Sequence, residues 1–164
     1  ASAIRRDVYE AMIDQSASAG AFGHGYTYSG HPVACAVALR VLEIYDRDEI
    51  FDRASTTGKY LQEQLSQFSS HPLVGEVRGS GLLAALELVP NKELNHQFKD
   101  GKVGGVAQKM AQDNGLLIRT VAGSSIGICP PLIITNNQID ELIDKLGDAL
   151  DKTFHYCQTY NLLT

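Results

Sequence analysis

A glycine-rich loop that runs straight into an apolar helix constrains this chain most. The loop, GHGYTYSGHP, covers residues 23–32, and the apolar segment follows at 33–45. Gly25 and Gly30 permit backbone conformations that other residues rarely adopt. Pro32 suits the first turn of a helix, because the backbone N–H that proline lacks would have no partner within the helix there. Free amides and the helix dipole favour negative charge at such a point. The loop is therefore either an anion site or a simple turn, and spacing alone leaves both open.

The segment 33–45 is apolar nearly all round, with Arg40 and Glu43 as its charged residues. A helix of this kind is buried on most sides, so we expect it to lie between two bodies of structure. Residues 1–20 predict a helix that ends in a small-residue linker at 16–20. Because the chain opens on Ala1 and this helix has no start of its own, we expect the chain to be a piece of a longer protein.

The rest of the chain predicts a small α+β layer. Apolar spacing predicts helices at 50–68, 106–114 and 136–154, and short strands at 73–78, 82–89, 116–121 and 125–129. Residues 91–105 are expected to form an exposed loop and residues 155–164 a loose tail. Thr135 and Gln138 predict a capping box before the last helix. This order favours a mostly antiparallel sheet that helices cover on one face.

Composition excludes several classes of protein. The 164 residues carry a net charge of −5 without a Lys/Arg cluster, which argues against a nucleic-acid surface. No apolar run approaches the roughly 20 residues of a membrane span. The three scattered cysteines resemble reduced thiols of a cytoplasmic protein, and neither they nor the five histidines have metal-ligand spacing, so we expect no metal.

One arginine stands out because it lies inside an apolar strand. Arg119 follows Leu117 and Ile118, and it should share a strand face with Leu117 and Val121. A charge there must reach the sheet edge, find a partner or bind an anion. Arg119 is either an edge arginine whose side chain extends into water, or a residue whose planar guanidinium binds a carboxylate through two hydrogen bonds. Arg78, at a strand end beside glycines, is a weaker case of the same kind.

Two glycine-containing motifs are expected to be turns. Residues 123–127, GSSIG, match the pattern around the nucleophile of serine hydrolases, with Ser125 as the candidate. That motif needs a helix after the serine, whereas here Pro130 and Pro131 follow closely. Residues 79–81, GSG, lack the third glycine of a dinucleotide-binding loop and open no helix.

Four segments in order resemble the class III pyridoxal-phosphate-dependent aminotransferases, which include ω-amino acid:pyruvate and amine:pyruvate transaminases. They are HGYTYSGHP with ACA at 24–36, VRGSGL at 77–82, GLLIR at 115–119 and CPPLIIT at 129–135. The resemblance implies the aspartate aminotransferase-like fold. Residues 1–32 would end the large cofactor domain, with its phosphate loop. Residues 33–46 would form a connecting helix and 47–164 the C-terminal small domain.

The resemblance also implies roles for particular residues. Thr27 matches the threonine that holds the phosphate of pyridoxal 5'-phosphate in the neighbouring subunit of a homodimer with shared active sites, and Tyr26 would lie near that phosphate. Arg119 matches an arginine that binds the substrate carboxylate. His24 and His31 flank the loop and either take part in binding or fix its shape.

The family's catalytic lysine lies upstream of the segment that matches Ala1, so we expect no catalytic residue in this chain and no turnover by the chain alone. The parent enzyme would move an amino group between an amine or ω-amino acid and a keto acid such as pyruvate. Two alternatives stay open. One is a stand-alone interaction module derived from this fold, and the other is a decarboxylase or aminomutase of the same superfamily.

Overall fold

The computed structural model describes residues 3–20, 22–23, 25–93, 96, 98 and 101–163. The chain forms two compact units, Ala1–Leu42 and Glu43–Thr164. The division falls inside helix α2, Pro32–Arg47, and within the range 33–46 that the sequence predicts as a connecting helix. The predicted three-part domain organisation stays a prediction. His24 lies outside the described residues.

The N-terminal unit contains α1, Arg6–Ala19, the glycine-rich loop and the first part of α2, Pro32–Arg47. The predicted linker at 16–20 is wrong, because α1 continues to Ala19. The hydroxyl groups of Ser16 and Ser18 donate to the carbonyl oxygens of Ile13 and Gln15, at 2.7 and 3.1 Å, and are thereby satisfied inside the helix. Gly20, at φ 81°, ends it.

Helix α2 begins at Pro32, as predicted, but carries no buried residue. Val33 is 65% exposed and Leu39 is 63% exposed. The prediction that this helix is buried is therefore wrong for the chain by itself.

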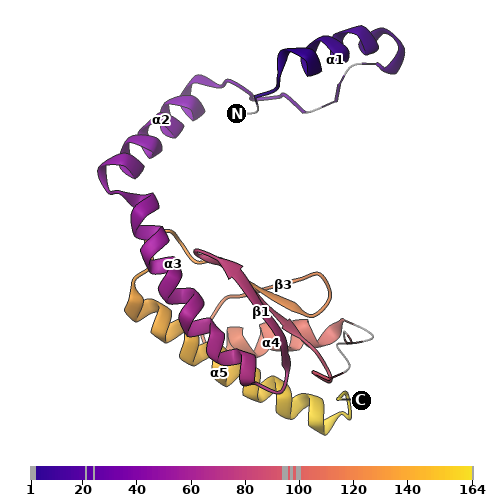
Figure 1. Ribbon diagram of the computed structural model, residues 1–164, viewed down its shortest axis with the longest axis vertical. Coiled ribbons are helices and arrows are strands. Elements are labelled where there is room, and N and C mark those ends of the chain that lie inside the picture. The colour runs from indigo at the N-terminus through magenta and orange to yellow at the C-terminus, as the bar shows by residue number, and fades with distance from the viewer. Residues whose placement is uncertain are drawn as a thin grey trace. The chain divides into compact units, whose positions relative to one another are not determined.

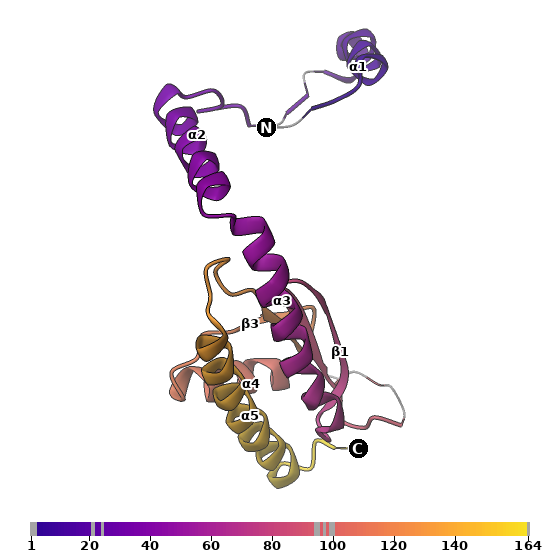
Figure 2. The same ribbon diagram turned by 60° about the vertical axis from the view of Figure 1, so that its left-hand side comes forward.

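The elements of the C-terminal unit are α3 at Ile50–Ser66, the 3-10 turn η1 at Gln67–Ser70, β1 at Val74–Ser80, β2 at Leu83–Leu88, α4 at Lys102–Asp113, β3 at Arg119–Val121, β4 at Ser125–Ile128 and α5 at Asn136–Thr159. The four strands form an antiparallel sheet in the order β1-β2-β4-β3 (Figure 1). Three helices pack with it, and α5 contacts both α3 and α4 (Figure 2). This is the predicted α+β arrangement.

The core lies between one face of the sheet and these helices. On β2 and the turn before it, every second residue is buried, as the sequence predicts: Leu82, Ala84, Leu86 and Leu88. Leu61 and Leu65 of α3 and Leu146 of α5 belong to the same cluster and are fully buried. Each such leucine stabilises the fold by about 1.5–3 kcal/mol relative to an exposed one. The packing fixes which face of the sheet stays open.

Several predicted boundaries are wrong. Residues 102–105 belong to α4 rather than to a loop, because Val103 and Gly104 are buried against the rest of the unit. Residues 155–159 continue α5, where Cys157 is fully buried. Gly79 and Ser80 pair with β2 as part of β1, and the turn lies at 81–82. Only residues 119–121 of the predicted strand 116–121 pair with a neighbour.

The predicted capping box is present. The Thr135 hydroxyl accepts a hydrogen bond from the Gln138 backbone N–H at 3.3 Å, and Gln138 Oε1 accepts one from the Thr135 N–H at 3.0 Å. Two orphan amides at the start of α5 are thus satisfied by side chains, and the helix that covers the sheet begins at a defined residue.

Candidate functional site

The glycine-rich loop has the backbone that its composition predicts. Gly25 and Gly30 have φ values of 73° and 72°, in the region open to glycine. The Ser29 N–H donates to the Tyr26 carbonyl oxygen at 2.8 Å and the His31 N–H to the Tyr28 carbonyl oxygen at 3.2 Å. The loop is therefore a tight double turn that leads directly into the first residue of α2.

Thr27 and Tyr28 are the unusual members of this loop. Tyr28 has φ 68°, a conformation that non-glycine residues rarely adopt, and its ring lies 5.9 Å from that of His31. Within the part of the chain that the structure describes, neither the amide nor the hydroxyl group of Thr27 makes a hydrogen bond. Both donors stand at an exposed turn beside a helix start, an arrangement suited to an anion. Tyr26, 59% exposed, is its neighbour.

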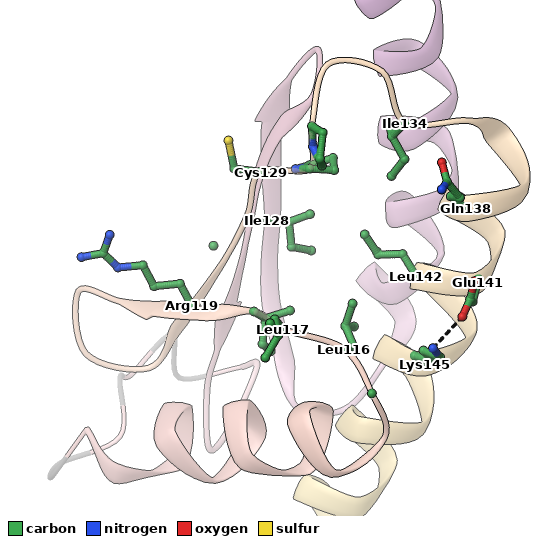
Figure 3. Close-up of a pocket in the computed structure, with 15 residues that line it drawn as sticks. Leu116, Leu117, Arg119, Ile128, Cys129, Ile134, Gln138, Glu141, Leu142 and Lys145 are labelled. Carbon is green, nitrogen blue, oxygen red and sulfur yellow. Dashed lines mark hydrogen bonds and ion pairs between the residues drawn. The ribbon is translucent and has the colours of Figure 1, made fainter.

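Arg119 is the first residue of β3, an edge strand that pairs with β4 alone. It is exposed on the same side as Leu117 and Val121, which confirms the predicted strand face. Figure 3 shows its guanidinium extending away from α5 and from the apolar side chains beneath the strand. The guanidinium of Arg119 therefore lies on the exposed side of β3, where its donors are accessible, and both interpretations of this arginine stay open.

A cavity of about 530 Å³ lies behind this strand, between residues 115–119, residues 127–131 and the start of α5. Leu116, Ile128 and Leu142 point into it in Figure 3. At its rim Glu141 and Lys145 form an ion pair at 2.6 Å, and the hydrogen bond from Lys145 lowers the pKa of Glu141. The cavity is an apolar space with a satisfied ion pair, and it lacks a free acid–base pair among the described residues that line it.

A cluster that sequence reasoning missed holds β3 against α4. The Thr120 N–H donates to Gln108 Oε1 at 3.0 Å, and the Thr120 hydroxyl group lies 2.9 Å from the same oxygen and 3.0 Å from the Gly104 carbonyl oxygen. Nothing in the spacing of Gln108 and Thr120, twelve residues apart on a helix and a strand, predicts this contact. It lies directly next to Arg119 in sequence.

The other candidates have structural roles. Arg78 is held between Glu76 and Glu87, each at 2.8 Å, and the hydrogen bond to Glu87 raises its pKa. Ser125 begins β4 and is 3% exposed, with a strand rather than a helix after it, so the hydrolase motif is a turn as predicted. Among the described residues, His, Cys, Asp and Glu side chains form no cluster that could hold a metal ion.

Comparison with known proteins decides the family. Residues 1–150 match the model of the family described as aminotransferase class-III. The chain belongs to the class III aminotransferases. This match confirms the resemblance that the sequence motifs indicate. The cofactor of the family is pyridoxal phosphate.

Three relatives show the range within these aminotransferases. The chain is 43% identical over 148 residues to gamma aminobutyrate transaminase 1, mitochondrial, of Solanum lycopersicum, and 44% identical over 147 residues to putrescine–pyruvate aminotransferase of Pseudomonas aeruginosa. These matches cover 90% and 89% of the chain but 28% and 32% of the relatives. The omega transaminase of Pseudomonas jessenii, solved in complex with PMP, matches 93% of this chain and 34% of its own at 39% identity, with a TM-score of 0.80.

The class III chain thus spans about a third of the length of these relatives. Tyr26 and Thr27 belong to its N-terminal unit and Arg119 to its C-terminal unit. The roles that the family resemblance implies for them stay predictions. Among the described residues, no helix is both long and apolar enough to cross a membrane.

Proposed function

We propose that this chain forms the C-terminal part of a pyridoxal-phosphate-dependent transaminase that moves an amino group between an amine or ω-amino acid and a keto acid such as pyruvate. The observation that carries the proposal is the class III match over residues 1–150, which includes both the loop and Arg119. The names of the relatives, which mention gamma-aminobutyrate, putrescine and pyruvate, support this substrate class.

The loop residues fit a phosphate group. The amide and hydroxyl of Thr27 stand exposed before the start of α2, where the helix dipole favours an anion. In the proposed homodimer with shared active sites, Thr27 would hold the cofactor phosphate and Tyr26 would lie beside it. Pyridoxal phosphate, when bound, supplies the carbonyl group that takes up and returns the amino group.

Four of the described lysines are held by other groups of the chain. Lys109, Lys145 and Lys152 pair with carboxylates four residues away on their own helices, and Lys92 donates to the Ser69 carbonyl oxygen at 2.6 Å. Such exposed pairs are typical of solvated helix faces. We propose that the lysine that binds the cofactor lies outside this chain, so that the chain alone has no transaminase turnover.

Arg119 supplies the recognition of the substrate carboxylate. A planar guanidinium on an exposed strand face can form two parallel hydrogen bonds to a carboxylate. In the full-length enzyme, Arg119→Ala should lower the specificity constant for keto acids and amino acids by roughly 10- to 150-fold, the equivalent of a charge-assisted hydrogen bond. Neutral amines should be affected little. Steady-state kinetics with both substrate classes measures this, with Arg47→Ala, an exposed arginine at the end of α2, as control. Equal losses for both classes would contradict the role.

Thr27→Ala should weaken retention of the cofactor in the full-length protein. Thr27→Ala removes one hydroxyl donor and leaves the turn in place. Thr27→Ser keeps a hydroxyl group and should therefore retain the cofactor as the natural residue does. Dialysis followed by absorbance of the remaining bound cofactor measures the effect, and Thr56→Ala, on the exposed face of α3, is the matched control. Unchanged retention in Thr27→Ala would argue against the phosphate site.

A further inference from the structure

The strand that carries Arg119 has little backbone support of its own. β3 is three residues long, lies at the sheet edge and, among the described residues, pairs only with β4. The turn that follows it is strained, because Ala122 has φ 41°. A short edge strand of this kind depends on contacts from its other side to hold one orientation.

Helix α4 supplies those contacts at one point. A Cβ atom on Gly104 would lie 2.5 Å from Thr120 Cγ2 and 3.1 Å from the Gly123 carbonyl oxygen, so the helix backbone is pressed against the strand. The Thr120 hydroxyl group donates its single proton to Gln108 Oε1 or to the Gly104 carbonyl oxygen, 2.9 and 3.0 Å away. The Thr120 N–H donates to Gln108 Oε1 at 3.0 Å.

We propose that Gln108 is a positioning residue that sets the direction of Arg119 toward the substrate carboxylate. The inference rests on the proposed carboxylate role of Arg119. Gln108 fixes the peptide unit that joins Arg119 to Thr120, because the N–H that it binds belongs to that unit. A small rotation of this peptide unit moves the guanidinium at the far end of the side chain by a larger distance. Misplacement of a binding group by about 1 Å can lower the reaction rate by about 100-fold.

The position of Gln108 separates this role from a purely structural one. The residue is exposed and contributes no buried apolar side chain to the core. Its truncation therefore removes the hydrogen bonds to Thr120 and leaves the packing of α4 on the sheet in place, since Val103, Ala107 and Ala111 remain buried.

Gln62 offers a matched control at the other end of the sheet. It also extends from a helix to backbone groups of the sheet, with its Nε2 donating to the carbonyl oxygens of Gly81 at 2.8 Å and Leu83 at 3.3 Å. Those bonds hold the β1–β2 hairpin and touch neither β3 nor α4. Gln62→Ala should therefore leave carboxylate recognition unchanged.

The test uses the full-length, cofactor-loaded enzyme with pyruvate as acceptor and a neutral amine as donor. Gln108→Ala should raise the KM for pyruvate about three- to tenfold, the range that loss of one or two hydrogen bonds supports. The kcat and the KM for the amine should stay unchanged. Gln108→Glu keeps an acceptor oxygen and should restore the KM. Hydrogen exchange of the Thr120 amide, read without any turnover, should accelerate in Gln108→Ala and not in Gln62→Ala.

The outcomes separate the positioning role of Gln108 from the carboxylate role of Arg119. Three results would overturn the positioning role of Gln108 and leave the role of Arg119 untouched. They are an equal change in the KM values for pyruvate and for the amine, failure of Gln108→Glu to restore the KM for pyruvate, and the same effect from Gln62→Ala. If Arg119→Ala lowers the specificity constant equally for carboxylate substrates and neutral amines, the proposed role of Arg119 is wrong, and so is the inference about Gln108.

Discussion

At the scale of single residues, His71 couples the stability of the C-terminal unit to pH. Its side chain is 12% exposed, its Nδ1 accepts the Leu73 N–H at 3.1 Å, and its Nε2 lies 3.3 Å from Asp151 Oδ1. Burial lowers the pKa of His71 below the ordinary 6.5; the hydrogen bond to Asp151 opposes this shift and Lys92 adds to it. The neutral ring is therefore the form that the fold prefers.

We expect stability to fall as the pH drops from about 6.5 through the lower folded pKa. In that window the unfolded chain binds the proton more readily than the folded one, so acid favours unfolding; above 6.5 the contribution of His71 is constant. Chemical denaturation between pH 8 and pH 5 measures this. His71→Asn keeps an acceptor for the Leu73 N–H and cannot titrate, so it should flatten this part of the profile. An unchanged profile in the variant would place the dependence elsewhere.

At the scale of elements, α3 meets the β1–β2 turn at a contact that only glycine allows. A Cβ atom on Gly58 would lie 2.5 Å from Gly81 Cα and 2.6 Å from its carbonyl carbon, both backbone atoms that cannot rotate away. Gly58→Ala should therefore lower the free energy of unfolding by about 1–3 kcal/mol, the usual cost of overpacking. Denaturant titration measures it.

The control is a helical glycine with open space around it. Nothing lies within 4 Å of a Cβ atom on Gly105 of α4, so Gly105→Ala should stabilise the chain by about 0.5–1 kcal/mol through helix propensity. Both changes add the same methyl group to a helix. If they shifted stability in the same direction, the close approach of α3 to the turn would not be the cause.

Elements with a strong period could be predicted from the sequence, and contacts between distant segments could not. The buried face of β2 and the capping box at Thr135 follow from local spacing, and so does the exposed face of Arg119. The start of α4 was missed because Gly104 and Gly105 favour a loop locally, whereas packing of Gly104 against Thr120 decides the outcome. Gln108 was missed because its bond to Thr120 is a product of that packing.

At the scale of the whole molecule, α2 presents an apolar surface. Val33, Val37 and Val41 follow one another at four-residue spacing and are 65%, 59% and 38% exposed. Leu39 and Leu42, at 63% and 54%, extend the apolar surface around the helix. Apolar side chains exposed together on one helix favour association between protein molecules. A second copy of the chain can supply the same surface in return, because a two-fold contact is complementary to itself.

The purified chain should therefore self-associate through α2, with a mass in solution above the 17.8 kDa of one copy. Light scattering after gel filtration, over a range of concentrations, measures it. Val37→Lys places a charge in the middle of the valine stripe and should shift the mass toward 17.8 kDa while helix content by circular dichroism stays the same. Leu117→Lys, at a residue 85% exposed in the other unit, should leave association intact. A single copy at every concentration would contradict the prediction, and equal dissociation by both variants would show that association does not depend on α2.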